Sequence, residues 1–257
     1  MLDAVRLAVG TLTIAPVTAP RAVDRDTWRS AITLAPLIGV ALGGASFALG
    51  WLVLQLSDSS LLAAVTAVGV MAASTRGLHL DGLVDVADGL GSRRPPAEAR
   101  DIMRQSDIGP FGVLAVVFAV LGQVAALQIT FASEDTATAA VIVVGAAVIS
   151  RAAIVAACRR GQPTTPEGLG SQVVGSAPTS LALAVVVAAL AAVMLAASAV
   201  DVEFLLAVTA AGAVAFVVAE LWRIHCVRRL RAVTGDVLGS ILELSATTFL
   251  VVAVLVA

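Results

Sequence analysis

Long apolar segments constrain the fold of this chain more than any other feature. Seven segments of about 18 residues or more consist mainly of Ala, Val, Leu and Gly. About 20 residues of α-helix cross the hydrocarbon core of a bilayer, and the backbone groups there must bond to one another because no water reaches them. We therefore expect transmembrane helices at 32–56, 61–78, 111–132, 139–158, 181–199, 204–222 and 238–256.

The fold class that follows is all-α. We expect a polytopic integral membrane bundle of about seven transmembrane helices that forms one domain over residues 1–257. Hydrophobic residues make up 59% of the chain and the mean hydropathy is +1.00, which excludes an ordinary soluble domain. The second predicted span is the weakest, because its purely apolar part ends at Ser74.

The N-terminal segment has a different character from the predicted spans. It reads MLDAVRLAVGTLTIAPV, with Asp3 and Arg6 among apolar residues and a break at Pro16. It does not resemble a signal peptide, which has a basic start and a small-residue cleavage site. We expect an amphipathic helix that lies at the membrane interface before the first span.

The arginines lie on one side of the predicted spans. All sixteen basic residues are Arg, and the loops around Asp58, Glu134 and Asp201 contain none of them. Because cytoplasmic loops are enriched in Arg and Lys, the N-terminus is predicted to be cytoplasmic and the C-terminus to lie outside. Long loops are usually functional, so the cytoplasmic face of the membrane is the expected working face. The long cytoplasmic loops are 79–110, 159–180 and 223–237.

Three aspartates follow the second predicted span within a short stretch, HLDGLVDVADG. Asp81, Asp85 and Asp88 are spaced i, i+4, i+7, which places them within roughly 60° of one helix face over about 10 Å. Their charges repel one another and Asp is a poor helix former. A Mg²⁺ ion bound through carboxylates and substrate phosphates would offset that cost. The alternative is a solvated acidic face of a surface helix, which the apolar residues on the other sides disfavour.

A second polar stripe begins at the last predicted span. In TGDVLGSILEL, Asp236, Ser240 and Glu243 repeat the same spacing, and Glu243 would lie about 10 Å past Asp236, inside the membrane. An ionisable residue at that depth is a functional candidate. The alternative for Glu243 is an interhelical hydrogen bond to a Ser or to an Arg such as Arg151. Two acidic stripes that enter from the same side predict one shared metal and phosphate site.

Several arginines near the stripes suit a phosphate group, because a guanidinium binds phosphate oxygens in pairs. We favour Arg104, beside SDIGPFG, and Arg151, within a span; others are expected to face anionic lipid headgroups. His79 would point roughly 160° away from the aspartates on a continuous helix. For His79, the roles of ligand, general base and plain interfacial histidine stay open. The other arginines in question are Arg93, Arg94, Arg100, Arg159 and Arg160.

Together these stretches resemble the cobalamin synthase family, the adenosylcobinamide-GDP ribazoletransferases. The resemblance rests on GLHLDGLVDVADGLGSRR, IMRQSDIGPFGVLA and TGDVLGSILEL, and it extends over essentially the whole chain, including the N-terminal TLTIAPV. It implies a polytopic, Mg²⁺-dependent inner-membrane enzyme. In the implied reaction, the 5′-hydroxyl of α-ribazole, or of its 5′-phosphate form, attacks the phosphate of adenosylcobinamide-GDP that is attached to the aminopropanol arm, and GMP leaves.

The resemblance assigns roles to residues that match the family motifs, alongside those proposed above. A carboxylate or His79 is expected to take the hydroxyl proton. The expected catalytic residues are His79, Asp81, Asp85, Asp88 and Asp236. The expected Mg²⁺ ligands are Asp81, Asp85, Asp88, Asp236 and Glu243. The expected substrate-binding residues are Arg93, Arg104, Ser106, Asp107, Gly109, Arg151 and Gly239.

The chain departs from the family pattern at two places. Gln105, Ser106 and Asp107 stand where Asp-Ser-Arg is expected before the glycine, and Ala246 stands where many members have a second Glu. The roles of those family positions, a phosphate-binding Arg above all, do not transfer to this chain. The expected partners are the small-molecule substrates and the lipid bilayer, with no nucleic acid. Association into a homo-oligomer or with other cobalamin-pathway enzymes stays open.

Two other functions compete with this interpretation. A CDP-alcohol phosphotransferase would share the first half of its motif, but Ile102, Ser106 and Pro110 occupy the Gly, Asp and Asp positions of the second half. An ion-coupled secondary transporter would place its acidic residues near the midplane and show inverted repeats, and neither is visible. A purely structural scaffold would leave the two carboxylate stripes unexplained.

Overall fold

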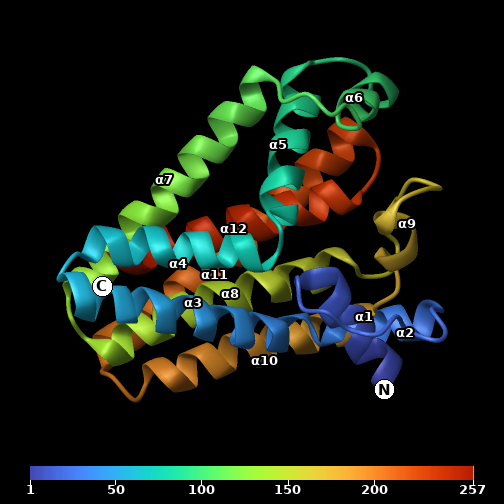
Figure 1. Cartoon of the computed structure of the whole chain (residues 1–257). Coiled ribbons are helices and arrows are strands. Elements are labelled where there is room, and N and C mark those ends of the chain that lie inside the picture. The colour runs from blue at the N-terminus through green and yellow to red at the C-terminus, as the bar shows by residue number, and fades with distance from the viewer. Residues whose placement is uncertain (257) are drawn as a thin grey trace.

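The computed structural model describes residues 1–256 of the chain, and that range contains helices and no strands, which confirms the all-α prediction (Figure 1). Most helices run along a common direction, and α5, α6 and α9 lie toward one end. The helices are α1 (Leu2–Leu12), α2 (Arg25–Thr33), α3 (Ala35–Ser57), α4 (Ser60–Ser74), α5 (Leu78–Gly91), α6 (Pro96–Ile102), α7 (Pro110–Ala132), α8 (Thr136–Ala157), α9 (Leu169–Val173), α10 (Thr179–Ala197), α11 (Val202–Leu230) and α12 (Gly235–Val256).

Six of the predicted spans are helices long and apolar enough to cross a membrane within the described residues. The prediction of 61–78 as a straight span was wrong at its C-terminal end. Helix α4 ends at Ser74, and α5 leaves it at an angle of 87°. The chain turns at Arg76 and Gly77, whose positive φ angles of 56° and 68° cannot continue a right-handed helix. Neither α4 nor α5 is long enough to count as a span by itself, but the two together, as a bent pair, are long enough.

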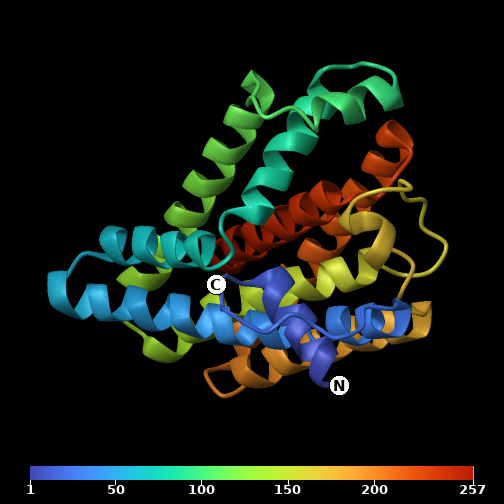
Figure 2. The ribbon, with the colours of Figure 1, turned by 45° about the vertical axis from the view of Figure 1, so that its right-hand side comes forward.

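Helix α8 occupies the centre of the bundle, between α3, α10, α11 and α12 (Figures 1 and 2). Its apolar window is 78% buried, compared with 22% for that of α10. Glycines of α3 permit the closest approach, because a Cβ on Gly39 would lie 2.6 Å from the Ala147 carbonyl oxygen and one on Gly43 would lie 2.9 Å from the Val144 Cα. The hydrophobic effect does not drive helices together within lipid, so close backbone packing of this kind stabilises their association.

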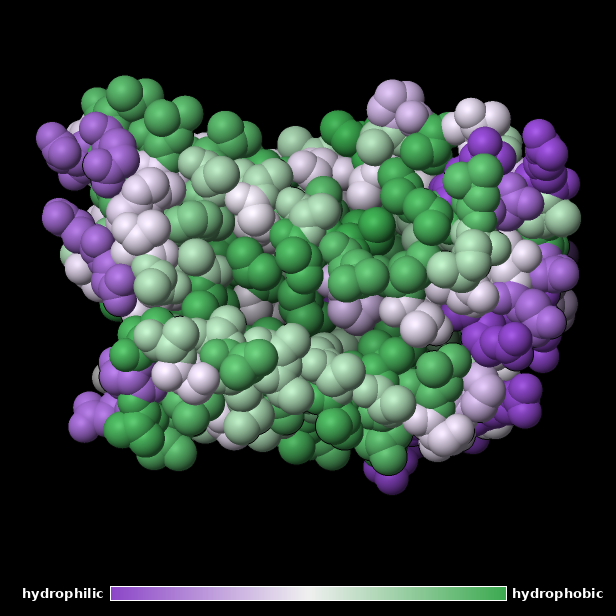
Figure 3. Space-filling model, turned by 90° about the horizontal axis from the view of Figure 1, so that it is seen from below, coloured by the Kyte–Doolittle hydropathy of each residue, from purple (hydrophilic) through white to green (hydrophobic). Residues whose placement is uncertain are grey.

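The surface agrees with a multi-pass membrane protein. Figure 3 shows a broad area of hydrophobic residues between two hydrophilic ends. At the turns that contain no Arg, the acidic residues have a structural role: Asp135 accepts a hydrogen bond from the Ala137 N–H, and Asp201 accepts one from the Phe204 N–H. These carboxylates are N-caps of α8 and α11.

The N-terminal segment forms the expected amphipathic helix, but its apolar face packs on protein. In α1, Leu7, Ala8 and Leu12 are buried in a cluster that includes Trp28 of α2. The segment after α1 is fastened to the bundle by a hydrogen bond from the Ile14 N–H to the Ser74 carbonyl. Helices α1 and α2 therefore pack against the bundle at one of its ends.

The three long loops that were predicted to be cytoplasmic contain helices. Residues 79–110 include α5 and α6, and residues 159–180 include α9. The predicted loop 223–237 is shorter than expected, because α11 continues through polar residues as far as Leu230. Arg223 at this end is buried and bound to Glu220, which lets the helix extend beyond its apolar part.

Candidate active site

The two acidic segments of the sequence lie side by side, where α5 crosses α12 (Figures 1 and 2). Glycine makes the crossing close. A Cβ on Gly82 would lie 2.8 Å from the Asp236 carbonyl oxygen, and a Cβ on Gly239 would lie 3.2 Å from the His79 Cα. The expected convergence of residues 81–88 with residues 236–243 is therefore present. Gly239 serves this helix contact as well as lining the adjacent cavity.

Asp81, Asp85 and Asp236 form an acidic cluster at this crossing. Asp81 is exposed and Asp85 and Asp236 are partly buried. Asp85 lies within electrostatic range of both of the others and of Asp88, and no Arg opposes this repulsion at Asp85. Partial burial weakens the solvent screening of these like charges. The cluster therefore favours a bound cation or a cationic ligand group.

The Asp88 carboxylate contacts helix α7, whereas the acidic cluster lies where α5 crosses α12. Its two carboxylate oxygens accept hydrogen bonds from the backbone N–H groups of Gly109, at 2.8 Å, and Gly112, at 2.9 Å. Gly109 is the N-cap of α7 and Gly112 lies in its first turn, so Asp88 caps α7 from a neighbouring helix. The glycines are required, since a Cβ on either would lie 2.4 Å from an Asp88 oxygen.

We expect Asp88→Ala to lower the free energy of unfolding by about 1–2 kcal/mol, because two N–H groups at the start of α7 lose their acceptors. Thermal unfolding of the purified protein in detergent measures the loss. Asp101→Ala is the matched control, because the Asp101 carboxylate is exposed and binds only Arg104, at 3.2 Å. Equal unfolding midpoints for the two variants would contradict the capping role.

Glu243 and Arg151 lie deeper in the bundle, away from the acidic cluster. Glu243 accepts a hydrogen bond of 2.9 Å from Gln123 of α7 and lies within electrostatic range of Arg151, and both charged side chains are buried. Arg151 donates to the Ala147 carbonyl, at 3.1 Å. The interhelical hydrogen bond that was the alternative for Glu243 is therefore present, but its donor is Gln123 and not a Ser or Arg151. Glu243 is therefore not part of the acidic cluster with Asp81 and Asp85. Arg151 does not line the cavity that lies beside this cluster.

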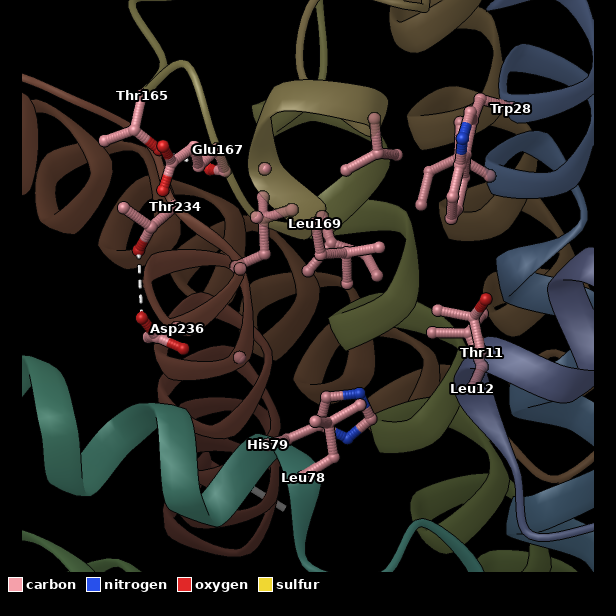
Figure 4. Close-up of a pocket in the computed structure, with 18 of the residues that line it drawn as sticks. Thr11, Leu12, Trp28, Leu78, His79, Thr165, Glu167, Leu169, Thr234 and Asp236 are labelled. Atoms are coloured by element: carbon pink, nitrogen blue, oxygen red, sulfur yellow. Dashed lines mark hydrogen bonds between the residues drawn. The ribbon is translucent and has the colours of Figure 1, made fainter. Parts of the chain in front are cut away.

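A cavity of about 430 Å³ opens beside the acidic cluster (Figure 4). Asp236 of α12 and Thr234, which precedes α12, lie on one side of it, and Trp28 of α2 lies on the opposite side. His79 borders the cavity from below in this view. His79 lies within the continuous helix α5, turned away from the aspartates as geometry predicts, and this turn directs it into the cavity that Asp236 also lines.

The comparisons with known proteins identify the family. Residues 4–254 match the family of cobalamin-5-phosphate synthases. Relatives named adenosylcobinamide-GDP ribazoletransferase are similar over almost the whole chain: one from Frankia casuarinae is 38% identical, covering 98% of this chain and 94% of its own length. The chain belongs to the cobalamin-5-phosphate synthase family.

Other members of the family support the same match. The relative from Nocardioides is 38% identical, covering 95% of both chains, and the one from Escherichia coli is 32% identical, covering 89% of both. No solved structure matches this chain. Membership confirms the resemblance stated from the motifs and the assignment to the transferases, and it disfavours the CDP-alcohol phosphotransferase and transporter alternatives.

The predicted phosphate-binding arginines of this family member occupy different environments. Arg104 lines the cavity, lies within electrostatic range of Asp236 and pairs with Asp101 on the surface. Arg93 is exposed just after α5, in a left-handed conformation with φ of 54°. Ser106 and Asp107 are exposed in the turn between α6 and α7 and do not line the cavity.

Sequence reasoning missed most of the cavity wall. Leu12 belongs to the N-terminal segment that was expected to lie at the membrane interface, and Trp28 lies in α2, for which no prediction was made from the sequence. Gly170 of α9 packs on Thr234, where an added Cβ would lie 2.9 Å from the Thr234 Cα. Arg100 also lines the cavity and donates a hydrogen bond to the Leu230 carbonyl. The lining residues that the sequence had marked are His79, Arg104, Asp236 and Gly239, with Arg100 among the candidate phosphate-binding arginines.

The carboxylates at the crossing of α5 and α12 suit a Mg²⁺ ion that takes its remaining ligands from substrate and water. Within residues 1–256, no three His, Cys, Asp or Glu side chains form a group that could hold a metal ion by themselves. Mg²⁺ commonly binds one or two carboxylates and takes its other ligands from substrate phosphates and water. Asp85 with Asp81 or Asp236 offers that donor set, whereas Asp88 and Glu243 are held by other partners.

Proposed function

We propose that this chain joins α-ribazole, or its 5′-phosphate, to adenosylcobinamide-GDP and releases GMP. The proposal rests on family membership and on one structural observation. The acidic cluster of Asp81, Asp85 and Asp236 borders a cavity large enough for a small-molecule substrate, since ligand sites measure about 300–1,000 Å³. A phosphate donor at the cluster and an acceptor in the cavity would meet at Asp236, which belongs to both.

Phosphoryl transfer requires positioning and charge stabilisation more than covalent help from the protein. Asp81 and Asp85 would hold Mg²⁺ against the pyrophosphate of adenosylcobinamide-GDP. When bound, the ion supplies electrostatic stabilisation of the phosphate oxygens. Arg104 and Arg100, which line the same cavity, would bind phosphate oxygens and orient the donor.

The nucleophilic hydroxyl must lose a proton as the new P–O bond forms and the bond to the departing GMP breaks. Asp236 is our choice for the group that accepts this proton, because its carboxylate faces the cavity next to the acidic cluster. His79 lines the same cavity and would hold the hydroxyl in line for attack. Asp88 would act indirectly, by anchoring α5 to α7.

The membrane orientation belongs to the same proposal. The N-terminal helices, α6, α9 and the cavity share the end of the molecule where the arginines gather, and the opposite turns lack Arg. By the positive-inside bias this end faces the cytoplasm, so the proposed enzyme works at the cytoplasmic side of the inner membrane. Its association with itself or with other enzymes of the pathway stays a prediction.

The decisive experiment is an assay of GMP release by the purified protein in lipid nanodiscs. We expect GMP only when adenosylcobinamide-GDP and α-ribazole, or its 5′-phosphate, are both present. Equal GMP release without the acceptor would indicate hydrolysis, and no release with either acceptor would refute the proposal. Comparison of the two acceptors at equal concentration determines whether the nucleophile carries a phosphate.

Removal of the metal provides a separate prediction. Treatment with EDTA is expected to abolish GMP release, and added Mg²⁺ is expected to restore it, because the like charges of Asp81, Asp85 and Asp236 would otherwise repel the pyrophosphate. Ca²⁺ is the comparison ion, since it prefers more ligands at longer distances. Undiminished turnover in EDTA would remove the metal from the proposal while leaving the transferase activity intact.

A further inference from the structure

We infer that the apolar half of the cavity binds the benzimidazole ring of α-ribazole, with Trp28 as the residue that sets the specificity for this base. This inference rests on the proposed function and adds where the base of the acceptor binds and which residue recognises it. It also assigns a role to α1 and α2, which the proposed chemistry does not otherwise use.

The cavity is divided into a polar and an apolar half. His79 and Asp236 lie on the side of the acidic cluster, and Arg104, which also lines the cavity, lies within electrostatic range of Asp236. The side formed by α1, α2 and α8 contains Trp28, 8% exposed, surrounded by aliphatic side chains. These aliphatic residues are Leu7, Ala8, Leu12, Ala31, Ile32 and Ile154.

The chemistry of this apolar half selects among the parts of the two substrates. A guanine base carries donors and acceptors along its edge, and burying them without partners is costly. The aliphatic side chains around Trp28 have no hydrogen-bonding groups. A benzimidazole ring is flat and mostly apolar, so it loses little on entering and gains stacking on the indole. A corrin ring is too large for a cavity of about 430 Å³.

The arrangement of the two halves also orients the acceptor. With the base beside Trp28, the ribose extends across the cavity toward Asp236, which lies on the opposite side (Figure 4). The 5′-oxygen of the ribose would then meet the group that we propose accepts its proton. Thr11 of α1 lines the cavity beside Leu12, on the same side as Trp28, so a larger side chain there would reduce the space for the acceptor.

The test compares the KM values of the two substrates in four variants of the full-length protein in nanodiscs. Trp28→Ala is expected to raise the KM for α-ribazole about tenfold and to leave the KM for adenosylcobinamide-GDP within about twofold of wild type. Trp28→Phe keeps an aromatic face and should recover most of the loss. Thr11→Phe narrows the cavity and should also raise the KM for α-ribazole. Trp51→Ala is the control, since Trp51 packs with Phe47 and Phe131, away from the cavity.

Equilibrium dialysis of radiolabelled α-ribazole gives a readout that does not depend on turnover. Wild type and Trp51→Ala should bind it, and Trp28→Ala should bind it about tenfold more weakly. Unchanged α-ribazole affinity and KM in Trp28→Ala would overturn the inference, as would an increase confined to the KM for adenosylcobinamide-GDP. If Trp28→Ala does not fold, an unchanged KM for α-ribazole in Thr11→Phe would overturn it equally. Binding without GMP release by wild type would instead count against the proposed function alone.

Discussion

Asp85→Asn is expected to lower the rate of GMP release by about 10³-fold while the protein still inserts and folds. Asp85 stands at the centre of the acidic cluster, within electrostatic range of Asp81, Asp88 and Asp236. The amide keeps the size of the side chain but removes the charge that would hold Mg²⁺ on the pyrophosphate. Steady-state assays in nanodiscs measure the loss, and the thermal unfolding midpoint reports on folding.

The control for this variant is Asp58→Asn. Asp58 lies in the turn between α3 and α4, at the opposite end of the bundle from the acidic cluster. The same chemical change there should leave the rate within about twofold of wild type. Full activity of Asp85→Asn would remove this carboxylate from the proposed site.

Gly82→Ala is expected to lower the rate of GMP release by about 10²-fold through packing. The new methyl group would lie 2.8 Å from the Asp236 carbonyl oxygen and 3.0 Å from the Asp236 Cα, both of which are backbone atoms. Because backbone cannot move aside as a flexible side chain can, α5 must shift away from α12. A displacement of about 1 Å between catalytic groups can reduce a rate by about 10²-fold.

Gly69→Ala provides the matched control for Gly82→Ala. Gly69 lies in α4, and an added Cβ there meets no atom within 4 Å. We expect Gly69→Ala to keep wild-type activity and Gly82→Ala to lose about 10²-fold of the GMP release rate. Wild-type activity of Gly82→Ala would show that the close crossing of α5 and α12 is unnecessary for the reaction.

Features that depend on neighbours along the chain could be predicted from the sequence. The apolar spans follow from segment length, because the bilayer imposes the same thickness on every helix. The helix that carries Asp81, Asp85 and Asp88 follows from their spacing, and the TGD motif correctly marked the start of α12. The family followed from these motifs because they are long and specific.

The end of α4 shows where such reasoning fails. The predicted span 61–78 ran four residues past its purely apolar part, which ends at Ser74, but backbone conformation at Arg76 and Gly77 ends the helix. A hydropathy pattern does not report φ angles. For the same reason, the sharp angle between α4 and α5, which brings the aspartates across α12, could not be predicted.

The sequence alone determined that this is a membrane protein of the cobalamin-5-phosphate synthase family and which acidic motifs it carries. Tertiary structure alone decided how those acids divide: Asp81 and Asp85 meet Asp236, Asp88 caps α7, and Glu243 pairs with Gln123. It also brought Trp28 to the cavity of Asp236. Each of these contacts joins helices that are distant in the chain, and a periodic pattern specifies which face of a helix is polar but not which partner that face will meet.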